Sequence, residues 1–159
     1  MQYQDLIKKR RSNRSYKTDM IPDDKMKKLY EALQIAPSGS NKQDFKFIFV
    51  TDTNLRKEIA QKACHQDFIQ EAPILMIAVC KKGYEFNTAI AVDHMILQAT
   101  DIGLGTCWIN WFGRDLPREL LNIPDELSIP IMVSIGYAND APDAKSRKNI
   151  DQLICHNKY

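Results

Sequence analysis

The sequence predicts one domain, residues 1–159, of the α+β or α/β class, with helices on both faces of a central sheet. The length is sufficient for one domain with a sizeable core. The composition, 44% hydrophobic and 26% charged, is typical of a soluble globular protein and not of a disordered one. Helical and strand patterns alternate along the chain, and no repeat, low-complexity stretch or linker divides them.

The first two elements are expected to be helices. Residues 2–10 form the first helix, and the second lies within 21–38, where Asp23 or Asp24 caps its start and Pro37 ends it. The side chains expected to face inward are Tyr3, Leu6 and Ile7 in the first helix and Met26, Leu29, Leu33 and Ile35 in the second.

A strand, a helix and a second strand are expected to follow. Residues 44–52 alternate and are rich in β-forming side chains, which predicts a strand. Residues 53–64 have the pattern of an amphipathic helix that is opened by a Thr/Asn cap. Residues 72–82 contain a continuous apolar run, as expected of a strand that is buried on both faces.

Residues 86–102 are expected to form the most apolar helix. Its polar positions share one narrow stripe, which consists of Asn87, His94, Gln98 and Asp101. Apart from Asp93, the rest of its surface is almost entirely apolar, so it must be covered nearly all round by its own sheet or by a second subunit. Beyond it we expect a strand at 105–112, a short helix at 114–124 and a strand at 129–139.

Basic side chains concentrate in two segments, 8–17 and 143–149, although the net charge of the chain is only +2. The first segment can face DNA phosphates, a membrane surface or one phosphorylated cofactor. A DNA-binding protein more often carries a basic face across several elements, and no apolar run here approaches the length that spans a bilayer. Arginine guanidinium groups match phosphate geometry, and Ser12 can add a hydroxyl donor. The two segments together favour one small anion.

Neither metal binding nor catalysis by side chains alone is indicated. The four cysteines are widely scattered without metal-like spacing, so we expect the reduced thiols of a cytoplasmic protein without a signal peptide. The sequence contains no hydrolase, metalloprotease or P-loop motif, and none of its three histidines lies in a recognisable triad context. If the protein is an enzyme, a cofactor is expected to perform the chemistry.

Two loops that contain glycine leave alternatives open. Residues 103–107, GLGTC, fail the dinucleotide-binding pattern because they follow a helix and lead into a strand. Gly103 suits a left-handed helix C-cap, whereas Gly105 marks either a turn or a place where a ligand or another backbone comes close. Residues 36–43, APSGSNKQ, form a polar loop that by itself indicates a surface turn.

Five motifs, in this order, resemble those of the nitroreductase family of FMN-dependent NAD(P)H oxidoreductases in its compact form. They are RRSNRSY (10–16), APSGSNKQDF (36–45), AVDHMILQATDIGLGTCWI (91–109), IPIMVSIGYA (129–138) and KSRK (145–148). Each motif is a weak signal alone. Together they span nearly the whole chain, and the order in which they occur makes the resemblance specific.

The resemblance implies an α+β fold with a central, mostly antiparallel sheet of four to five strands flanked by helices, in an intertwined homodimer. One FMN is expected at each of two subunit interfaces, with the loop at 37–43 approaching from the other subunit. The implied FMN-binding residues are Arg10, Arg11, Ser12, Arg14, Pro37, Ser38, Ser40, Asn41, Gln43, Gln66, Gly103, Leu104, Gly105, Thr106, Lys145 and Arg147.

The resemblance also implies an activity. NADH or NADPH is expected to deliver a hydride to N5 of FMN and leave, after which a flat acceptor such as a nitroaromatic or a quinone binds in the same place, in a ping-pong cycle. Arg14 is the implied catalytic residue, because a cation near the pyrimidine edge favours the anionic reduced flavin. Nucleic acid, a membrane and a metal are not expected as partners.

Two departures from the family pattern keep an alternative function open. Gln43-Asp44-Phe45 stands where the family has Gln-Pro-Trp, and the long insertion that builds a lid over the flavin in larger members is missing. The alternative is a flavin-binding or redox-responsive protein that has weak catalytic turnover or none.

Overall fold

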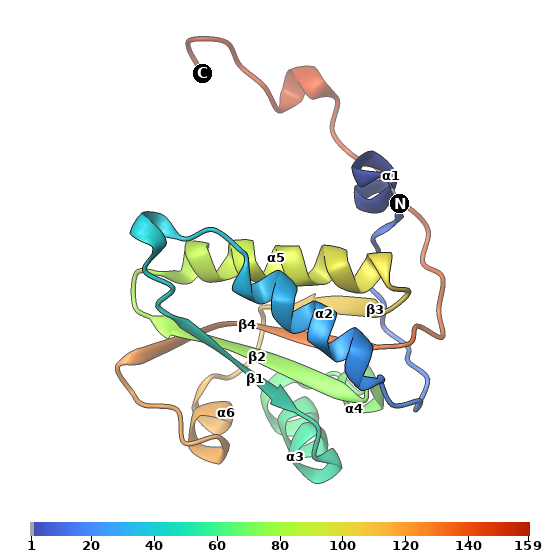
Figure 1. The fold of residues 1–159 in the computed structure, drawn as a ribbon, viewed down its shortest axis with the longest axis vertical. Coiled ribbons are helices and arrows are strands. Elements are labelled where there is room, and N and C mark those ends of the chain that lie inside the picture. The colour runs from blue at the N-terminus through green and yellow to red at the C-terminus, as the bar shows by residue number, and fades with distance from the viewer. Residues whose placement is uncertain (1) are drawn as a thin grey trace.

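Four antiparallel strands form the centre of the protein in the computed structural model, which describes residues 2–159. Their order across the sheet is β1-β2-β4-β3, and every neighbouring pair is antiparallel (Figure 1). The strands are β1 (Phe45–Val50), β2 (Ile74–Lys81), β3 (Gly105–Ile109) and β4 (Leu127–Gly136). The predicted α+β class with an antiparallel sheet is therefore confirmed, and the α/β alternative is wrong because that class requires parallel strands.

Helices cover both faces of this sheet, as the sequence predicts (Figure 1). One face carries α2 (Asp23–Gln34) and α5 (Glu85–Asp101). The other face carries α3 (Thr53–Glu58), the π-helical turn η2 (Ile59–Cys64), α4 (Phe68–Glu71) and α6 (Asp115–Leu120).

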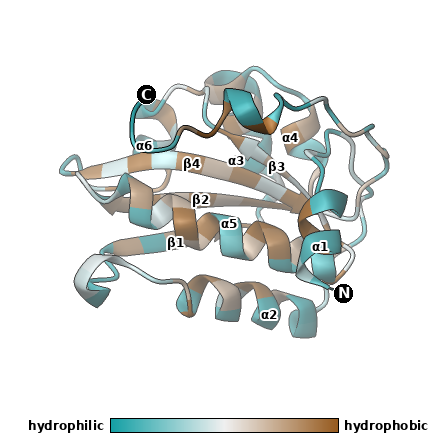
Figure 2. Ribbon diagram, turned by 90° about the horizontal axis from the view of Figure 1, so that it is seen from above, coloured by the Kyte–Doolittle hydropathy of each residue, from teal (hydrophilic) through white to brown (hydrophobic). Residues whose placement is uncertain are grey.

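The central strands explain why residues 72–82 are apolar without alternation. Successive side chains of a strand point to opposite faces, and β2 has a helical layer on each. Met76 packs into the core beneath α2 and α5, whereas the neighbouring Ile77 packs into the core beneath α3 and α6; both are fully buried. β2 is accordingly hydrophobic over nearly its whole length (Figure 2).

Two helices begin one or two residues earlier than predicted. The N-cap of α2 is Pro22, so Asp23 lies in the first turn instead of capping the helix; an acidic side chain there still suits the helix dipole. The N-cap of α3 is Asp52 instead of the Thr/Asn pair. Asp52, two residues beyond β1, has an extended backbone, and its carboxylate accepts a 2.8 Å hydrogen bond from the backbone N–H of Leu55.

The outer helical layer is less buried than predicted. In α1 (Tyr3–Lys9) no residue is fully buried, and Tyr3 and Ile7 are 67% and 44% exposed. Ile35, at the end of α2, is 76% exposed, and Phe86 at the start of α5 is 87% exposed. The expectation that Tyr3, Ile7 and Ile35 face inward is therefore wrong within this chain, and α5 is not covered all round by its own sheet.

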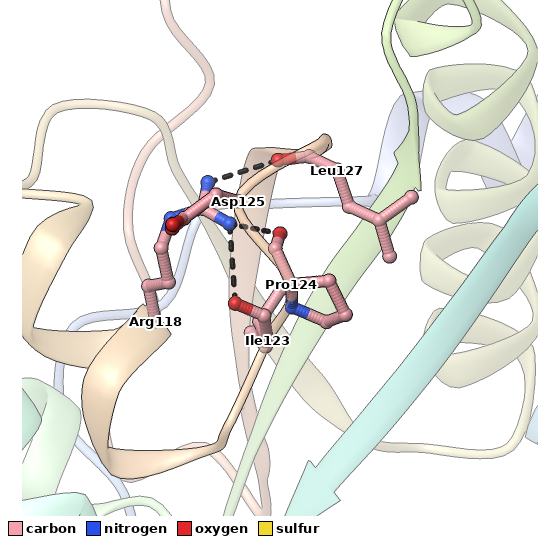
Figure 3. A network of polar contacts seen from close by, with 5 residues as sticks. All are labelled: Arg118, Ile123, Pro124, Asp125 and Leu127. Atoms are coloured by element: carbon pink, nitrogen blue, oxygen red, sulfur yellow. Dashed lines mark hydrogen bonds and ion pairs between the residues drawn. The ribbon is translucent and has the colours of Figure 1, made fainter.

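The turn between α6 and β4 is fixed by one side chain (Figure 3). The guanidinium of Arg118 donates to the carbonyl oxygens of Ile123, Pro124 and Leu127, at 3.3 Å for Ile123 and 2.9 Å for Leu127. It also forms an ion pair of 3.7 Å with Asp125. The Pro124 carbonyl also accepts a 3.1 Å hydrogen bond from the backbone N–H of Leu127. The Arg118 guanidinium adds side-chain donors to the same turn and so helps to set where β4 enters the sheet.

Beyond β4 the chain leaves the sheet and continues as an exposed arm. This arm passes beside α1 and carries one short 3-10 turn, η3 (Ile150–Gln152) (Figure 1). Ile150 and Leu153 are 70% and 63% exposed. Among the described residues, no helix is both long and apolar enough to cross a membrane.

Candidate cofactor site

The two basic segments predicted to hold an anion lie together in the fold. Residues 7–14 and 142–147 line one cavity of about 640 Å³. Its cationic side chains are Lys8, Arg10, Arg11, Arg14, Lys145 and Arg147, and Ser12 and the carboxylate of Asp143 also border it. Six of the predicted FMN-binding residues are thus brought to one place from the two ends of the chain.

The first basic segment is anchored along the end of the sheet. Ser12 forms an isolated parallel bridge with Thr106 in β3, and the N–H of Asn13 donates to the Thr106 carbonyl at 2.9 Å. Tyr16 forms an antiparallel bridge with Ala138, just beyond β4. The chain between Ser12 and Tyr16 therefore links the ends of both strands.

Tyr16 is the buried support of this segment. Its hydroxyl donates to the carbonyl of Asn13 at 2.9 Å and lies 2.8 Å from Oγ of Ser134. Burial, opposed by the hydrogen bond with Ser134, raises the pKa of the Tyr16 phenol far above its ordinary value. The phenol stays neutral, so its role is to hold Asn13 in place.

The cationic side chains around the cavity differ in whether they already form hydrogen bonds within the chain. Arg11 joins the two walls: its Nε donates to the carbonyl of Pro142 at 3.1 Å, and its Nη1 donates to the carbonyls of Lys8 and Arg10. In residues 2–159, neither Arg10 nor Arg14 has a hydrogen bond or an ion pair from its guanidinium. These two cations are therefore available to an anion, and the donor set fits a phosphate group.

A second cavity, of about 450 Å³, adjoins the first and shares Arg11 with it. Gly103 and Gly105 line it. Gly103 has a φ of 79°, which confirms the predicted left-handed C-cap of α5. Leu104 also lines this cavity, whereas Thr106 lines neither cavity; both residues are buried.

The structure accounts for Gly105 through a close approach of the chain to itself. A Cβ atom on Gly105 would lie 2.8 Å from both Oδ1 of Asn13 and Cβ of Ala138. Such a distance is well inside van der Waals contact. The absence of a side chain at this position is therefore required by Asn13 and Ala138, whatever else binds nearby.

The loop at 37–43 lies far from the basic cavity within one chain. It includes the short turn η1 (Gly39–Asn41), and the N–H of Gly39 donates to Oδ1 of Asn87, in the first turn of α5, at 3.0 Å. Thr100, near the other end of α5, lines the second cavity. At the helical rise per residue, these two positions are about 20 Å apart.

The backbone of the loop at 37–43 is strained. Three residues that are not glycine, Ser40, Asn41 and Gln43, have φ values of 52° to 53°. The conformation is held by hydrogen bonds within the loop, including one of 3.1 Å from the Gln43 N–H to Oγ of Ser38. Strained backbone of this kind is concentrated at binding sites in proteins. Pro37, Ser38, Ser40, Asn41 and Gln43 are therefore grouped, but apart from the other predicted site residues.

Gln66 lines neither cavity. It lies between η2 and α4, where its N–H donates to the carbonyl of Ala60 at 3.2 Å, on the face of the sheet opposite to α5. Two residues that line the second cavity, Asn13 and Asp140, were not predicted. Asn13 is only 8% exposed, and both Asn13 and the backbone of Arg14 are bound by the carboxylate of Asp140. The only feature of the sequence that could have indicated Asn13 is its position as an amide residue within a run of basic residues.

Comparison with known proteins identifies the family. A family model described as "Putative TM nitroreductase" matches residues 3–159. The chain belongs to the nitroreductase family. A relative named "Putative NADH dehydrogenase/NAD(P)H nitroreductase", from Archaeoglobus fulgidus, is 29% identical over 93% of this chain and 94% of its own length.

Two solved nitroreductases also resemble this chain. The crystal structure of a nitroreductase family protein from Clostridium novyi NT is 32% identical, with a TM-score of 0.83 over 91% of this chain and 89% of that one. An FMN-dependent nitroreductase from Clostridium difficile R20291 is 27% identical, with a TM-score of 0.85 over 97% and 98%. The resemblance inferred from the motifs is therefore confirmed at the level of family and fold.

Proposed function

We propose that this protein is an FMN-dependent oxidoreductase, a single nitroreductase-like domain that uses NADH or NADPH to reduce flat acceptors such as nitroaromatics or quinones. The observation that carries the proposal is the basic cavity, where Arg10, Arg11, Ser12, Arg14, Lys145 and Arg147 meet in a chain of this family. A related FMN-dependent nitroreductase supports the choice of cofactor.

The residues of the cavity suit the phosphate end of FMN. Arg10 and Arg14 offer guanidinium groups that have no partner among residues 2–159, Lys145 and Arg147 add charge from the C-terminal arm, and Ser12 adds a hydroxyl. Each charge-assisted hydrogen bond to a phosphate contributes about 1.5–3 kcal/mol. When bound, FMN supplies the redox chemistry, accepting a hydride from the nicotinamide and passing reducing equivalents to the acceptor.

Arg14 is the residue we assign to catalysis. Its side chain is exposed at the rim of the cavity, while its backbone N–H is held by Asp140 at 2.8 Å. A fixed cation beside a flavin stabilises the negative charge that develops on the ring during reduction. Arg14 therefore favours the reduced form without taking or giving a proton itself.

A second copy of the chain completes the proposed site. The loop at 37–43 and the second cavity, which adjoins the basic cavity, lie at opposite ends of α5, about 20 Å apart. A two-fold dimer that pairs the α5 helices in opposite directions brings the loop of one chain to the cavity of the other. Phe86, Ile35 and Tyr3 are large apolar side chains exposed on this side of the molecule, and such a dimer would cover them.

The first experiment is an absorbance spectrum of the purified protein before and after anaerobic addition of NADH and then NADPH. We expect a flavin band that one donor bleaches within seconds and that menadione or a nitroaromatic restores. A flavin band that neither donor bleaches would instead support the alternative, a flavin-binding protein without efficient turnover. Protein that is colourless and takes up no added FMN would refute the proposal.

A further inference from the structure

Asp140 stands where the two walls of the basic cavity separate. Up to this point the N-terminal segment and the chain beyond β4 run side by side: the N–H of Lys17 donates to the carbonyl of Tyr137, and the N–H of Asn139 donates to that of Ser15, both at 2.9 Å. Beyond it, one segment continues to Arg14 and Arg10 and the other to Lys145 and Arg147, and these cations line the cavity.

Both carboxylate oxygens of Asp140 accept hydrogen bonds from the N-terminal segment, next to these two backbone hydrogen bonds. Oδ1 accepts a 2.8 Å hydrogen bond from Nδ2 of Asn13, and Oδ2 accepts a 2.8 Å hydrogen bond from the backbone N–H of Arg14. Asn13 is itself fixed by Thr106 and Tyr16. Asp140 therefore transfers the rigidity of the sheet end to the backbone that carries Arg14.

The negative charge of Asp140 and its hydrogen bonds predict opposite effects on phosphate binding. A carboxylate beside a cationic cavity repels an anion, so on Coulomb's law alone its removal strengthens phosphate binding. If the carboxylate instead holds the cations in register, its removal weakens binding. Asp143 offers an internal comparison, because it lines the basic cavity itself, whereas Asp140 lines the adjoining second cavity, and Asp143 forms no hydrogen bond or ion pair within the described part of the chain.

We propose that Asp140 is a positioning residue for the phosphate of FMN: by binding Asn13 and the backbone of Arg14, it sets the arrangement of the cations, and this outweighs the repulsion of its own charge. The inference rests on the function proposed above and adds a role that neither the family motifs nor the cationic residues assign. It concerns binding of the phosphate, and not the redox step.

The test compares Asp140→Ala with Asp143→Ala, which remove one negative charge beside the basic cavity and one within it, respectively. Apo-protein is titrated with FMN and, separately, with riboflavin, which lacks the phosphate, and binding is followed by quenching of flavin fluorescence. We expect Asp140→Ala to bind FMN about tenfold more weakly than the parent, whereas Asp143→Ala binds it as tightly or more tightly. Riboflavin affinity should change little in either variant.

Asp140→Asn guards against loss of folding, because it keeps the shape and one acceptor oxygen. Its FMN affinity should fall between those of the parent and Asp140→Ala, at an unchanged melting temperature. Tighter FMN binding by Asp140→Ala, or equal losses for FMN and riboflavin, would overturn the positioning role while leaving the proposed function intact. A parent protein that binds neither flavin would refute both.

Discussion

The backbone of Gly105 lies so close to Asn13 that a methyl group on Gly105 would meet Oδ1 of Asn13 at 2.8 Å. Asn13 cannot retreat, because its N–H binds Thr106 and its side chain binds Asp140. The contact therefore ties the start of β3 to the segment that carries the cations of the candidate site.

Replacing Gly105 with alanine should destabilise the fold by about 1–3 kcal/mol, since an added methyl group overpacks a site that cannot relax. Urea unfolding measures the change. Gly113→Ala is the matched control, because the nearest atom to its Cβ would be the Ala63 carbonyl oxygen at 3.8 Å. Equal stability of the two variants would show that Asn13 moves aside readily.

Arg10 should bind the phosphate of FMN and little else. Its guanidinium lines the cavity without a partner among the described residues, so Arg10→Ala loses binding energy without breaking a structural contact. We expect FMN affinity to fall about tenfold or more, and riboflavin affinity to remain as in the parent. Lys46→Ala, which removes an exposed cation outside this cavity, is the control. A similar loss in both variants would indicate only a general effect of net charge.

Arg14 should act on the rate of flavin reduction more than on flavin binding. A cation that stabilises developing negative charge contributes to the transition state and the reduced form, and less to the oxidised complex. Arg14→Ala should therefore slow anaerobic reduction by NAD(P)H, measured by stopped-flow absorbance at saturating FMN, by a larger factor than it raises the FMN dissociation constant. Reduction at the parental rate would remove Arg14 from the catalytic role.

The sequence predicted those features that depend on local pattern. The continuous apolar run at 72–82 and the alternation at 44–52 correctly predicted strands β2 and β1. They could do so because the spacing of apolar side chains along a strand depends on whether one or both of its faces are buried. Tyr3 and Ile7 were misjudged for a related reason. Periodicity marks the apolar face of a helix, but it does not say whether the same chain covers that face.

The candidate site was predictable in content but not in layout. The cations named by the motifs line one cavity, and their role in binding stays a prediction. The distance from the loop at 37–43 to the second cavity follows from the length and direction of α5. Asp140 was missed because its partners, Asn13 and Arg14, lie 127 and 126 residues earlier in the chain. A hydrogen bond across such a separation leaves no local pattern to read.

A composite site makes a specific prediction for mixed dimers. Arg14→Ala damages the cavity, and Asn41→Gly removes a loop side chain while tolerating the positive φ at this position. If the loop serves the partner's cavity, a heterodimer of the two variants contains one intact site and one doubly defective site. An equal mixture that exchanges freely should then recover about a quarter of the parental sites. If each site lies within one chain, mixing recovers no activity, and the measurement is the NAD(P)H oxidation rate after refolding together.

Glu85 links the start of α5 to the start of β4 through a bond whose strength should depend on pH. Its Oε1 accepts a 2.7 Å hydrogen bond from Oγ of Ser128, and its Oε2 accepts one of 2.9 Å from the N–H of Gly83. The bond from Ser128 is the main cause that lowers the pKa of Glu85 below its ordinary value. A carboxyl group whose pKa is lower in the folded than in the unfolded protein stabilises the fold at pH values above its unfolded-state pKa. This stabilisation is lost as the pH falls through the folded-state pKa.

Ser128→Ala should therefore destabilise the protein by about 1 kcal/mol at neutral pH. The difference from the parent should shrink in acid, once Glu85 is protonated in both proteins. Urea unfolding at a series of pH values measures it, with Ser146→Ala in the exposed arm as a control that changes nothing. A destabilisation that stayed constant into acid would mean that the Ser128 hydroxyl does not act through the ionised carboxylate, because the charged form of Glu85 accepts a stronger hydrogen bond from this donor than the neutral form does.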